Sequence, residues 1–234
     1  LGIGISVSGF FTNIEGSLCS RQDPQGWSQI DWNETFSQPY QCPCYIENDG
    51  STATIGFSLT QTGAKLDSFF LMLLTRGIGG GFVFEGQLVR GNYGNAGEIA
   101  CLFSSDINAI RPTEESLYNY MHKAHSAPLT EEQIISFFNQ KDTSILSWIT
   151  ACVDSMDMPL KSIQSLFDPQ AIVLAGRLPL EIRQAIADKV SLSGPSFGDV
   201  SAPAPQLLVE GSPNILEKGA VAIPLFYFFR EANN

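Results

Sequence analysis

The sequence predicts an α/β fold whose central strands are mostly parallel. Continuous apolar runs of strand length occur at 68–75 (SFFLMLLT) and 171–176 (AIVLAG). Such runs are typical of strands that are buried on both faces. Segments with helical periodicity alternate with these strands, and strands separated by helices are typical of parallel sheets.

The first half of the chain is predicted to be rich in strands. Residues 2–8 alternate small and apolar side chains before Gly9, and 82–89 (FVFEGQLV) has two β-rich arms around Glu85 and Gly86. The expected elements are a strand at 2–8, a polar loop with one helical turn at 20–41, strands at 44–49 and 68–75, a closely packed helix at 51–63 and a hairpin at 82–89.

The second half is predicted to be mainly helical. Its helical segments begin near Asn, Asp or a TEE sequence, as capped helices do. The expected elements are helices at 113–124, 130–139, 143–165 and 180–190, strands at 171–176 and 205–211, and a final apolar helix at 215–229.

Composition limits the function classes. The 234 residues carry a net charge of −11 with only 13 Lys and Arg, so non-specific nucleic-acid binding by this chain is not expected. No apolar run is long enough for a membrane span, and no signal peptide is recognised. Five cysteines without framework spacing favour a reducing, cytoplasmic compartment. Because the chain opens inside a strand pattern (LGIGISVSG) without Met, we expect it to be part of a longer protein.

A glycine-rich segment, TRGIGGG, occupies 75–81. Glycine backbone can approach an anion closely, and its N–H groups can bind phosphate oxygens. The alternative is a tight turn with close sheet packing, and spacing alone favours this alternative because an isolated glycine cluster is weak evidence for a ligand.

Polar residues follow a predicted strand at Asn48 and Asp49. Ligand sites of α/β folds lie beyond the carboxyl ends of strands. There an Asn can bond a hydroxyl group, and an Asp can accept its proton as a general base. Alternatively, Asp49 only caps the following helix. Glu98, which follows Gly94 and Gly97, is either a further ligand or a solvated loop acid.

Taken together, several segments resemble the ROK family (repressor, open reading frame, kinase), in the family's order from Leu1 to about Phe229. The matching segments are VSGFFTN, GWSQIDW, ENDGSTA, GIGGGFVFEGQLVRGNYGNAGEI, DPQAIVLAG and GAVAI. The resemblance implies an actin-like, ribonuclease H-like sugar-kinase fold with two α/β lobes and a hexose in the cleft between them. On this basis we expect an incomplete first lobe at 1–48, a second lobe at 49–218 and a C-terminal helix at 219–234.

The resemblance also assigns roles to residues. The family's END motif falls on Glu47, Asn48 and Asp49, so that Asn48 would hold sugar hydroxyls and Asp49 would be the catalytic base. Gly9 and Glu98 match further sugar contacts. The family's nucleotide-binding glycines correspond to Gly77, Gly79, Gly80 and Gly176.

The sequence departs from the family pattern at the zinc site. Cys101 replaces the zinc-binding His, and the usual CxCGxxGC cluster is missing. A closed zinc site needs four N or S ligands. Cys42 and Cys44 are interpreted as core residues, and His122 and His125 as exposed helix residues, so we expect no structural zinc.

The nucleotide-binding segments also depart from the pattern. Thr75 and Arg76 replace a Gly and a Thr of the phosphate loop, and Ala175 and Arg177 replace glycines of the adenine segment. Each change adds bulk where a nucleotide would lie. The family's DxGxT segment is not found in the chain, and so we expect no phosphorylation by this chain alone.

Two functions from different classes follow. The first is the sugar-sensing effector domain of a ROK-type transcriptional repressor, a homodimer that contacts DNA only through an upstream domain. The second is an ATP-dependent hexose kinase that uses Mg-ATP, with Asp49 as the base. A catalytically inactive member with a structural role is a further alternative. The identity of the sugar is not predicted.

Overall fold

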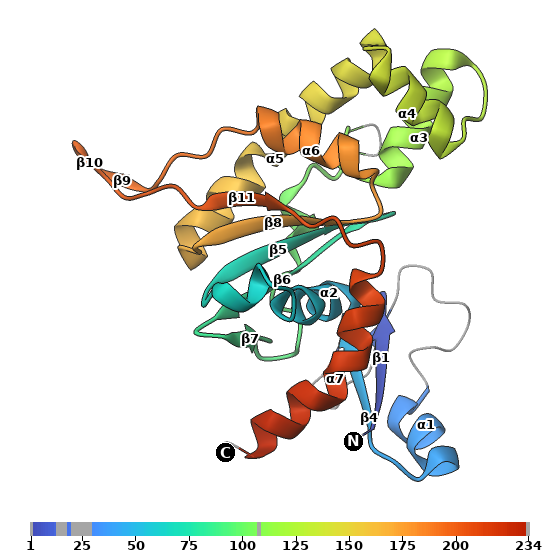
Figure 1. The fold of residues 1–234 in the computed structure, drawn as a ribbon, viewed down its shortest axis with the longest axis vertical. Coiled ribbons are helices and arrows are strands. Elements are labelled where there is room, and N and C mark those ends of the chain that lie inside the picture. Colours follow the sequence, from blue (N-terminus) through green and yellow to red (C-terminus); the bar gives the residue numbers. More distant parts are fainter. Residues whose placement is uncertain (1, 13–17, 20–29, 107–108, 233–234) are drawn as a thin grey trace. The chain divides into compact units, whose positions relative to one another are not determined.

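The computed structural model describes all residues except 1, 13–17, 20–29, 107–108 and 233–234 (Figure 1). Its strands are β1 (Ile3–Val7), β2 (Phe10–Phe11), β3 (Leu18–Cys19), β4 (Cys44–Asn48), β5 (Phe69–Leu74), β6 (Ile78–Phe84), β7 (Gln87–Val89), β8 (Ala171–Gly176), β9 (Ser196–Phe197), β10 (Val200–Ser201) and β11 (Gln206–Val209). Its α-helices are α1 (Trp32–Tyr40), α2 (Asp49–Ser58), α3 (Glu114–His125), α4 (Glu131–Asn139), α5 (Thr143–Phe167), α6 (Leu180–Lys189) and α7 (Ile215–Ala232). Two 3₁₀ helices are η2 (Gly63–Lys65) and η3 (Ile99–Leu102).

The predicted order of the expected strands and helices is confirmed. The differences lie at element ends and in the short strands β2, β3, β9 and β10, which were not predicted. The helix expected at 51–63 begins at Asp49 and ends at Ser58, because Thr60 bonds back to the Phe57 carbonyl and accepts from the Gly63 N–H. Instead of one turn, α1 has 9 residues, with Asp31 capping its first turn. The rest of the polar segment at 20–29, and with it most of GWSQIDW, lies outside the described residues.

The largest sheet has the order β11-β8-β5-β6-β7. Within this sheet β11 runs parallel to β8, and β6 and β7 form the predicted antiparallel hairpin. Every residue of β5 is buried, and so is all of β8 except Gly176. Burial on both faces explains why these two strands appear in the sequence as continuous apolar runs. A separate parallel pair joins β1 to β4.

The chain forms two compact units, each made from discontinuous segments. Unit 1 comprises Leu1–Leu71, Gly80–Glu98 and Asn214–Asn234, and unit 2 comprises Met72–Gly79 and Ile99–Pro213. The boundaries expected from the sequence, after residues 48 and 218, stay a prediction.

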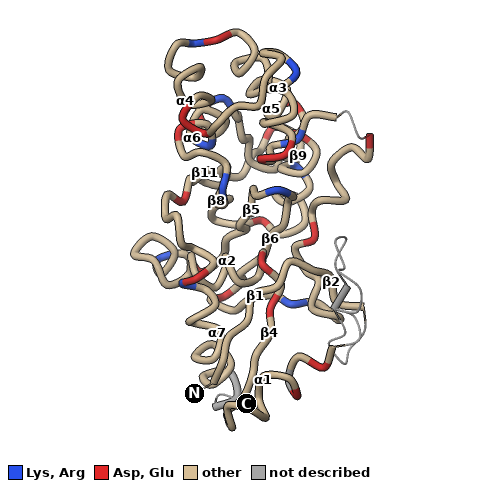
Figure 2. Tube along the Cα trace, turned by 90° about the vertical axis from the view of Figure 1, so that its right-hand side faces the viewer, with Lys and Arg blue, Asp and Glu red and all other residues tan. Residues whose placement is uncertain are grey.

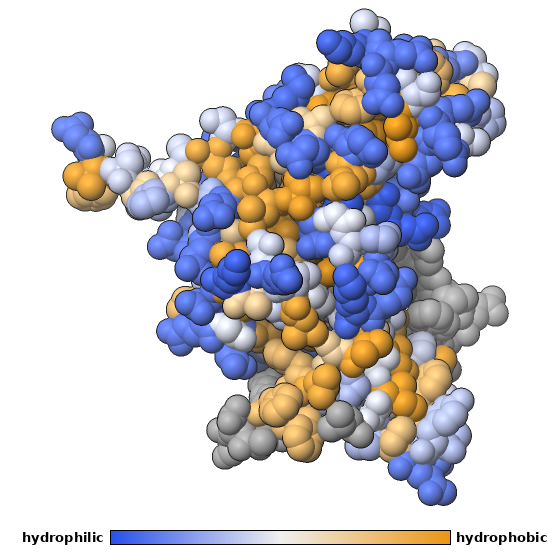
Figure 3. All heavy atoms as spheres, viewed as in Figure 1, coloured by the Kyte–Doolittle hydropathy of each residue, from blue (hydrophilic) through white to orange (hydrophobic). Residues whose placement is uncertain are grey.

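In unit 1, α7 packs against α2 and β1 through glycines. A Cβ atom at Gly219 would lie 1.9 Å from the Thr52 carbonyl oxygen, and one at Gly4 would lie 2.0 Å from the Ala220 carbonyl oxygen. The backbones therefore touch directly. The remaining face of α7 is exposed and apolar (Figure 3), with the large side chains Val221, Leu225, Phe228 and Phe229.

In unit 2, the long helix α5 supplies the core with a buried stripe that includes Ile145, Trp148, Cys152 and Met156. The indole Nε1 of Trp148 donates a 3.2 Å hydrogen bond to the hydroxyl of Ser116 on α3. Among the described residues, no helix combines the length and the apolar character needed to cross a membrane.

Three backbone segments of unit 1 meet at glycines, which we call the glycine junction: Gly50 of α2, Gly80 of β6 and Gly97. A Cβ atom at Gly50 would lie 2.4 Å from the Gly80 carbonyl oxygen, and one at Gly97 would lie 2.6 Å from the same oxygen. Gly97 also has φ +102°, which L side chains rarely adopt. The junction therefore requires glycine for reasons of space as well as conformation.

We predict that Gly50→Ala destabilises the protein by about 1–3 kcal/mol, the usual cost of overpacking a tight site. This loss should appear although Ala is the better helix former. Gly77→Ala is the matched control, since a Cβ atom there meets nothing within 4 Å. Urea unfolding measures both. Equal stability of the two variants would contradict the role of the junction.

Candidate functional site

The candidate sugar site lies in unit 1, where β4 ends and α2 begins. Asn48 is the N-cap of α2, and its Oδ1 accepts a 2.7 Å hydrogen bond from the Gly50 N–H. The alternative that Asp49 caps this helix is therefore wrong. With its oxygen used for capping, Asn48 directs Nδ2 to the Gly9 carbonyl at 2.6 Å and to Glu98 Oε1 at 3.3 Å.

Asp49 is the first residue of α2 and is half-buried. Its Oδ1 accepts a 2.9 Å hydrogen bond from the Gly50 N–H. Burial raises the pKa of Asp49 above its ordinary value, and hydrogen bonds from Ser8 and Gly50 oppose this rise. Desolvation of the charged form is therefore the larger effect.

Glu98 stands at the end of the second glycine segment and is also half-buried. Burial raises the pKa of Glu98, and the nearby charge of Asp49 raises this pKa further. The glycine junction thus brings together Asp49 and Glu98, which lie 49 positions apart in the chain. Two partly desolvated carboxyl groups beside an amide can bind the hydroxyl groups of a sugar, because hydrogen bonds to charged groups are among the stronger ones.

The sequence analysis missed Asn95, which holds the turn after β1 against the loop that leads to Glu98. The Oδ1 of Asn95 accepts from the Phe11 N–H at 2.8 Å, and its Nδ2 donates to the Phe11 carbonyl at 2.7 Å. These bonds span 84 positions, so only the local sequence around Asn95, a polar residue among glycines, gave a signal.

Gly9 takes part through its carbonyl, which accepts the Asn48 amide. The structure therefore places all four predicted sugar-site residues, Gly9, Asn48, Asp49 and Glu98, in one part of unit 1.

The predicted phosphate loop at 75–81 is shorter than expected. Residues 75–77 form the bend, whereas Gly79 and Gly80 lie within β6. Gly77 has open space around its Cβ position. The close-packing alternative therefore accounts for Gly80, whereas Gly77 has the open space expected of a loop glycine.

Gly176 lies where β8 ends in unit 2, with φ +120°. A Cβ atom at this position would lie 2.2 Å from the Leu74 carbonyl oxygen, and that same carbonyl accepts a 2.9 Å hydrogen bond from the Arg177 N–H. Gly176 is thus required by the close approach of the segments after β5 and β8.

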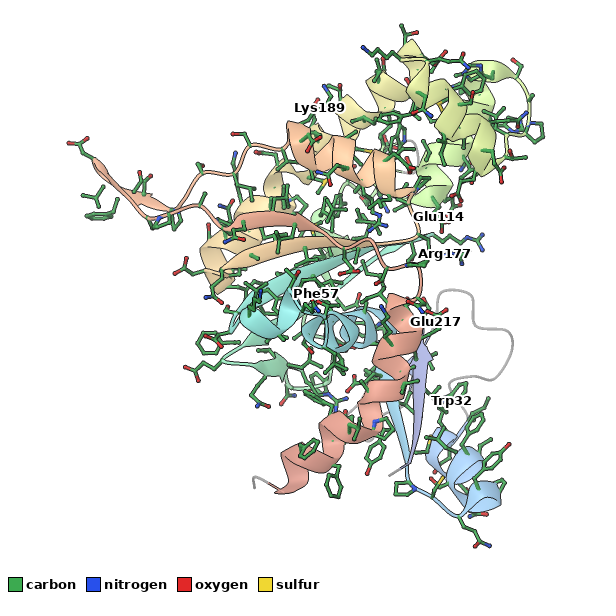
Figure 4. The ribbon with its side chains drawn as sticks, in the orientation of Figure 1. Trp32, Phe57, Glu114, Arg177, Lys189 and Glu217 are labelled. Atoms are coloured by element: carbon green, nitrogen blue, oxygen red, sulfur yellow. The ribbon has the colours of Figure 1, made fainter. Side chains whose placement is uncertain are left out.

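Two exposed arginines at these strand ends lie beside acids of α3. Arg76 Nε is 3.8 Å from Glu115 Oε2, and Arg177 Nε is 3.8 Å from Glu114 Oε1. Figure 4 shows Arg177 and Glu114 on the same side of unit 2. A carboxylate beside each of these two guanidinium groups fits a nucleotide's polyphosphate poorly. Along the described chain, Lys and Arg are scattered singly among Asp and Glu (Figure 2).

The residues considered for zinc are dispersed. Cys44 is buried, and Cys101 is exposed. His125, expected to be exposed, stacks on Phe137 with ring centroids 4.0 Å apart, and its Nε2 is 3.7 Å from Asp142. Within the described ranges, no three His, Cys, Asp or Glu residues are grouped as metal ligands. These residues do not fit the family's zinc, and the expectation of no structural zinc stays a prediction.

Comparisons with known proteins place the fold in the class of sugar-kinase-like α/β proteins. A ROK family protein from Streptococcus pneumoniae, solved in complex with sucrose, superposes with a TM-score of 0.73 at 21% identity, covering 99% of this chain and 81% of that one. The model of the ROK family matches residues 1–103. The predicted resemblance to this family is therefore confirmed, and the fold is that of sugar-kinase-like proteins.

Its curated relatives include both an enzyme and regulators. A β-glucoside kinase of Listeria monocytogenes is 26% identical over 187 residues, covering 75% of this chain and 64% of that protein. A xylose repressor of Bacillus subtilis is 23% identical over 186 residues, covering 74% of this chain and 47% of the repressor. The chain thus spans less than two thirds of the length of these relatives, both of which are named for functions that involve a sugar.

We predict that Asp49→Asn stabilises the protein at pH 7. The folded-state pKa is raised, so the folded chain holds the Asp49 proton more tightly than the unfolded chain does, and stability falls as the pH rises through this range. The gain of the variant should shrink as the pH approaches the unfolded value of about 3.9. Thermal unfolding from pH 4 to 8 measures it. Asp157→Asn, at an exposed acid paired with Lys161, is the control. A wild type that is more stable at pH 7 would refute the prediction.

We predict that the double variant Glu114→Gln, Glu115→Gln binds inorganic triphosphate more tightly than the wild type does. Removing a charge about 4 Å away changes the energy by about 1 kcal/mol in water, which is about fivefold in affinity for each carboxylate. Calorimetric titration measures this change. The control is the double variant Asp154→Asn, Asp157→Asn, which removes the same amount of negative charge from α5. If both double variants gain equally in triphosphate affinity, Glu114 and Glu115 have no special effect on phosphate binding.

Proposed function

We propose that this chain is the sugar-sensing effector region of a ROK-type transcriptional regulator, which binds a hexose or a hexose derivative through Asn48, Asp49 and Glu98. One observation carries the proposal: the hydrogen bond from Asn48 to Glu98, with Asp49 close enough to raise the pKa of Glu98. Names of relatives and structural neighbours support a sugar as the ligand, since they include a xylose repressor and a protein in complex with sucrose.

The site would recognise the sugar by hydroxyl geometry. Asp49 and Glu98 supply carboxyl oxygens that accept hydrogen bonds, and the cap at Asn48 keeps the amide of that residue in a fixed orientation. A ligand that binds one arrangement of the chain more tightly than another shifts the population toward that arrangement. DNA would be contacted by another part of a homodimeric, cytoplasmic protein, since this chain has a net charge of −11.

The acids beside Arg76 and Arg177 favour a sensor over a kinase. A kinase needs cationic groups that neutralise a transferring phosphoryl group. Here each of the two guanidinium groups lies 3.8 Å from a carboxylate. A sensor has no such requirement, and its sugar site can be kept while the phosphate-facing side chains change.

Asp49 favours the second candidate, an ATP-dependent hexose kinase. A carboxylate whose pKa is raised by burial is a better general base, because its pKa lies closer to the working pH. In this function Asp49 would accept the proton of the attacking sugar hydroxyl. The β-glucoside kinase among the relatives is in keeping with a kinase function.

The variant Asp49→Asn distinguishes the two functions. Calorimetry with D-glucose, D-xylose, sucrose and methyl β-D-glucopyranoside tests binding, and a coupled assay with ATP tests phosphorylation. We expect the wild type to bind at least one of these sugars without turnover, and Asp49→Asn to bind about tenfold more weakly, because a hydrogen bond to a charged group contributes about 1.5–3 kcal/mol. Asp157→Asn should bind like the wild type.

Turnover by the wild type that Asp49→Asn abolishes would instead establish the kinase. If none of the four sugars binds at millimolar concentration, the sugar-sensing proposal fails.

A further inference from the structure

Glu47, the first residue of the END segment, is a fully buried carboxylate that the proposed sugar site does not use. It lies in β4 directly before Asn48, which is also buried. A charge without solvent is costly unless it is paired and hydrogen-bonded. The position of Glu47 therefore depends on its partners.

Those partners come from two distant segments of unit 1. Arg90 Nη2 lies 3.3 Å from Glu47 Oε1. The hydroxyl of Tyr227, on α7, donates a hydrogen bond to the same carboxylate oxygen and accepts one from Arg90 Nη1. Tyr227 is itself fixed by stacking on Tyr45 of β4, with ring centroids 4.9 Å apart. We call Glu47, Arg90 and Tyr227 the buried triad.

The buried triad is connected to both halves of the site. Through Glu47 it fixes the residue next to Asn48, whose amide orients Glu98. Through Arg90 it reaches the other half, because the Arg90 carbonyl accepts a 3.0 Å hydrogen bond from the Ala96 N–H and so closes the loop that ends at Glu98. A single arginine thus holds the strand before Asn48 with its side chain and the loop before Glu98 with its backbone.

We propose that Arg90 and Tyr227 are positioning residues of the site, which set the distance between Asp49 and Glu98 through Glu47 and the loop at 91–98. The C-terminal helix α7 is then a functional part of the site and does more than cover α2. The effect on sugar affinity rests on the proposed function, whereas the effect on the two carboxyl groups does not.

The test compares Tyr227→Phe with Tyr45→Phe. The first variant removes the hydroxyl that bridges Arg90 and Glu47 and keeps the stacked ring. The second removes a hydroxyl from the same ring pair and leaves every atom of the buried triad in place. The readout is the titration of Asp49 and Glu98 in the 234-residue chain, followed by ¹³C NMR of the labelled carboxyl groups, together with affinity for methyl β-D-glucopyranoside.

In Tyr227→Phe, we expect the pKa of Glu98 to move back toward its ordinary value, because a looser site admits water and separates Glu98 from Asp49. Sugar affinity should fall about tenfold, the lower end of the loss seen when an outer partner of a binding group is removed. Tyr45→Phe should change neither quantity.

If Tyr227→Phe lowers the unfolding temperature but leaves both carboxyl titrations as in the wild type, the triad only stabilises the fold and the proposal is overturned. Arg90→Lys, which keeps the charge but not the forked geometry, provides the second variant if Tyr227→Phe does not fold, and it should shift the Glu98 titration in the same direction. A shifted titration in a protein that binds none of the four sugars would refute the sugar proposal and leave the positioning proposal standing.

Discussion

The candidate site depends on one steric constraint, the direct contact of three backbones at Gly50, Gly80 and Gly97. A side chain at Gly50 or Gly97 would occupy the space of the Gly80 carbonyl. Because the backbones touch, the first turn of α2 and the loop before Glu98 come close enough for Asn48 to bridge them. The same closeness removes water from Asp49 and Glu98. The glycines of this segment are therefore explained better by the close approach of the three backbones than by contact with a ligand.

This arrangement works against stability at the proposed sugar site. Burial raises the pKa of both Asp49 and Glu98, and the nearby charge of Asp49 raises the pKa of Glu98 further. The surrounding hydrogen bonds offset the cost: Asn48 caps α2, and Asn95 holds Phe11 by both backbone groups. Natural proteins commonly depart from local stability at functional sites, and the pair of Asp49 and Glu98 has this character.

The sequence predicted the order of the elements well, because periodicity and burial are local signals. The run at 68–75 indicates a buried strand without any knowledge of its neighbours. The alternative in which Asp49 is the N-cap is wrong, and the sequence could not exclude it, since Asn48 and Asp49 are both good caps and only φ and ψ distinguish them. Contacts between distant residues, such as Arg90 with Glu47 or Arg177 with Glu114, were not predictable, because no period or motif relates the partners. The sugar-site residues were grouped by family resemblance and not by spacing.

The buried triad and the exposed pairs made by Arg76 and Arg177 differ in how strongly the fold constrains them. Glu47 is fully buried, and removing the charged partner of a buried ion pair, here Arg90, typically costs about 3–5 kcal/mol. The pairs made by Arg76 and Arg177 are exposed, and such pairs contribute about 0–1 kcal/mol. Side chains at the ends of β5 and β8 can therefore change with little effect on folding, whereas those around Asn48 cannot. This asymmetry is in keeping with the proposed sensor, in which the sugar site would be kept while the side chains at the ends of β5 and β8 change.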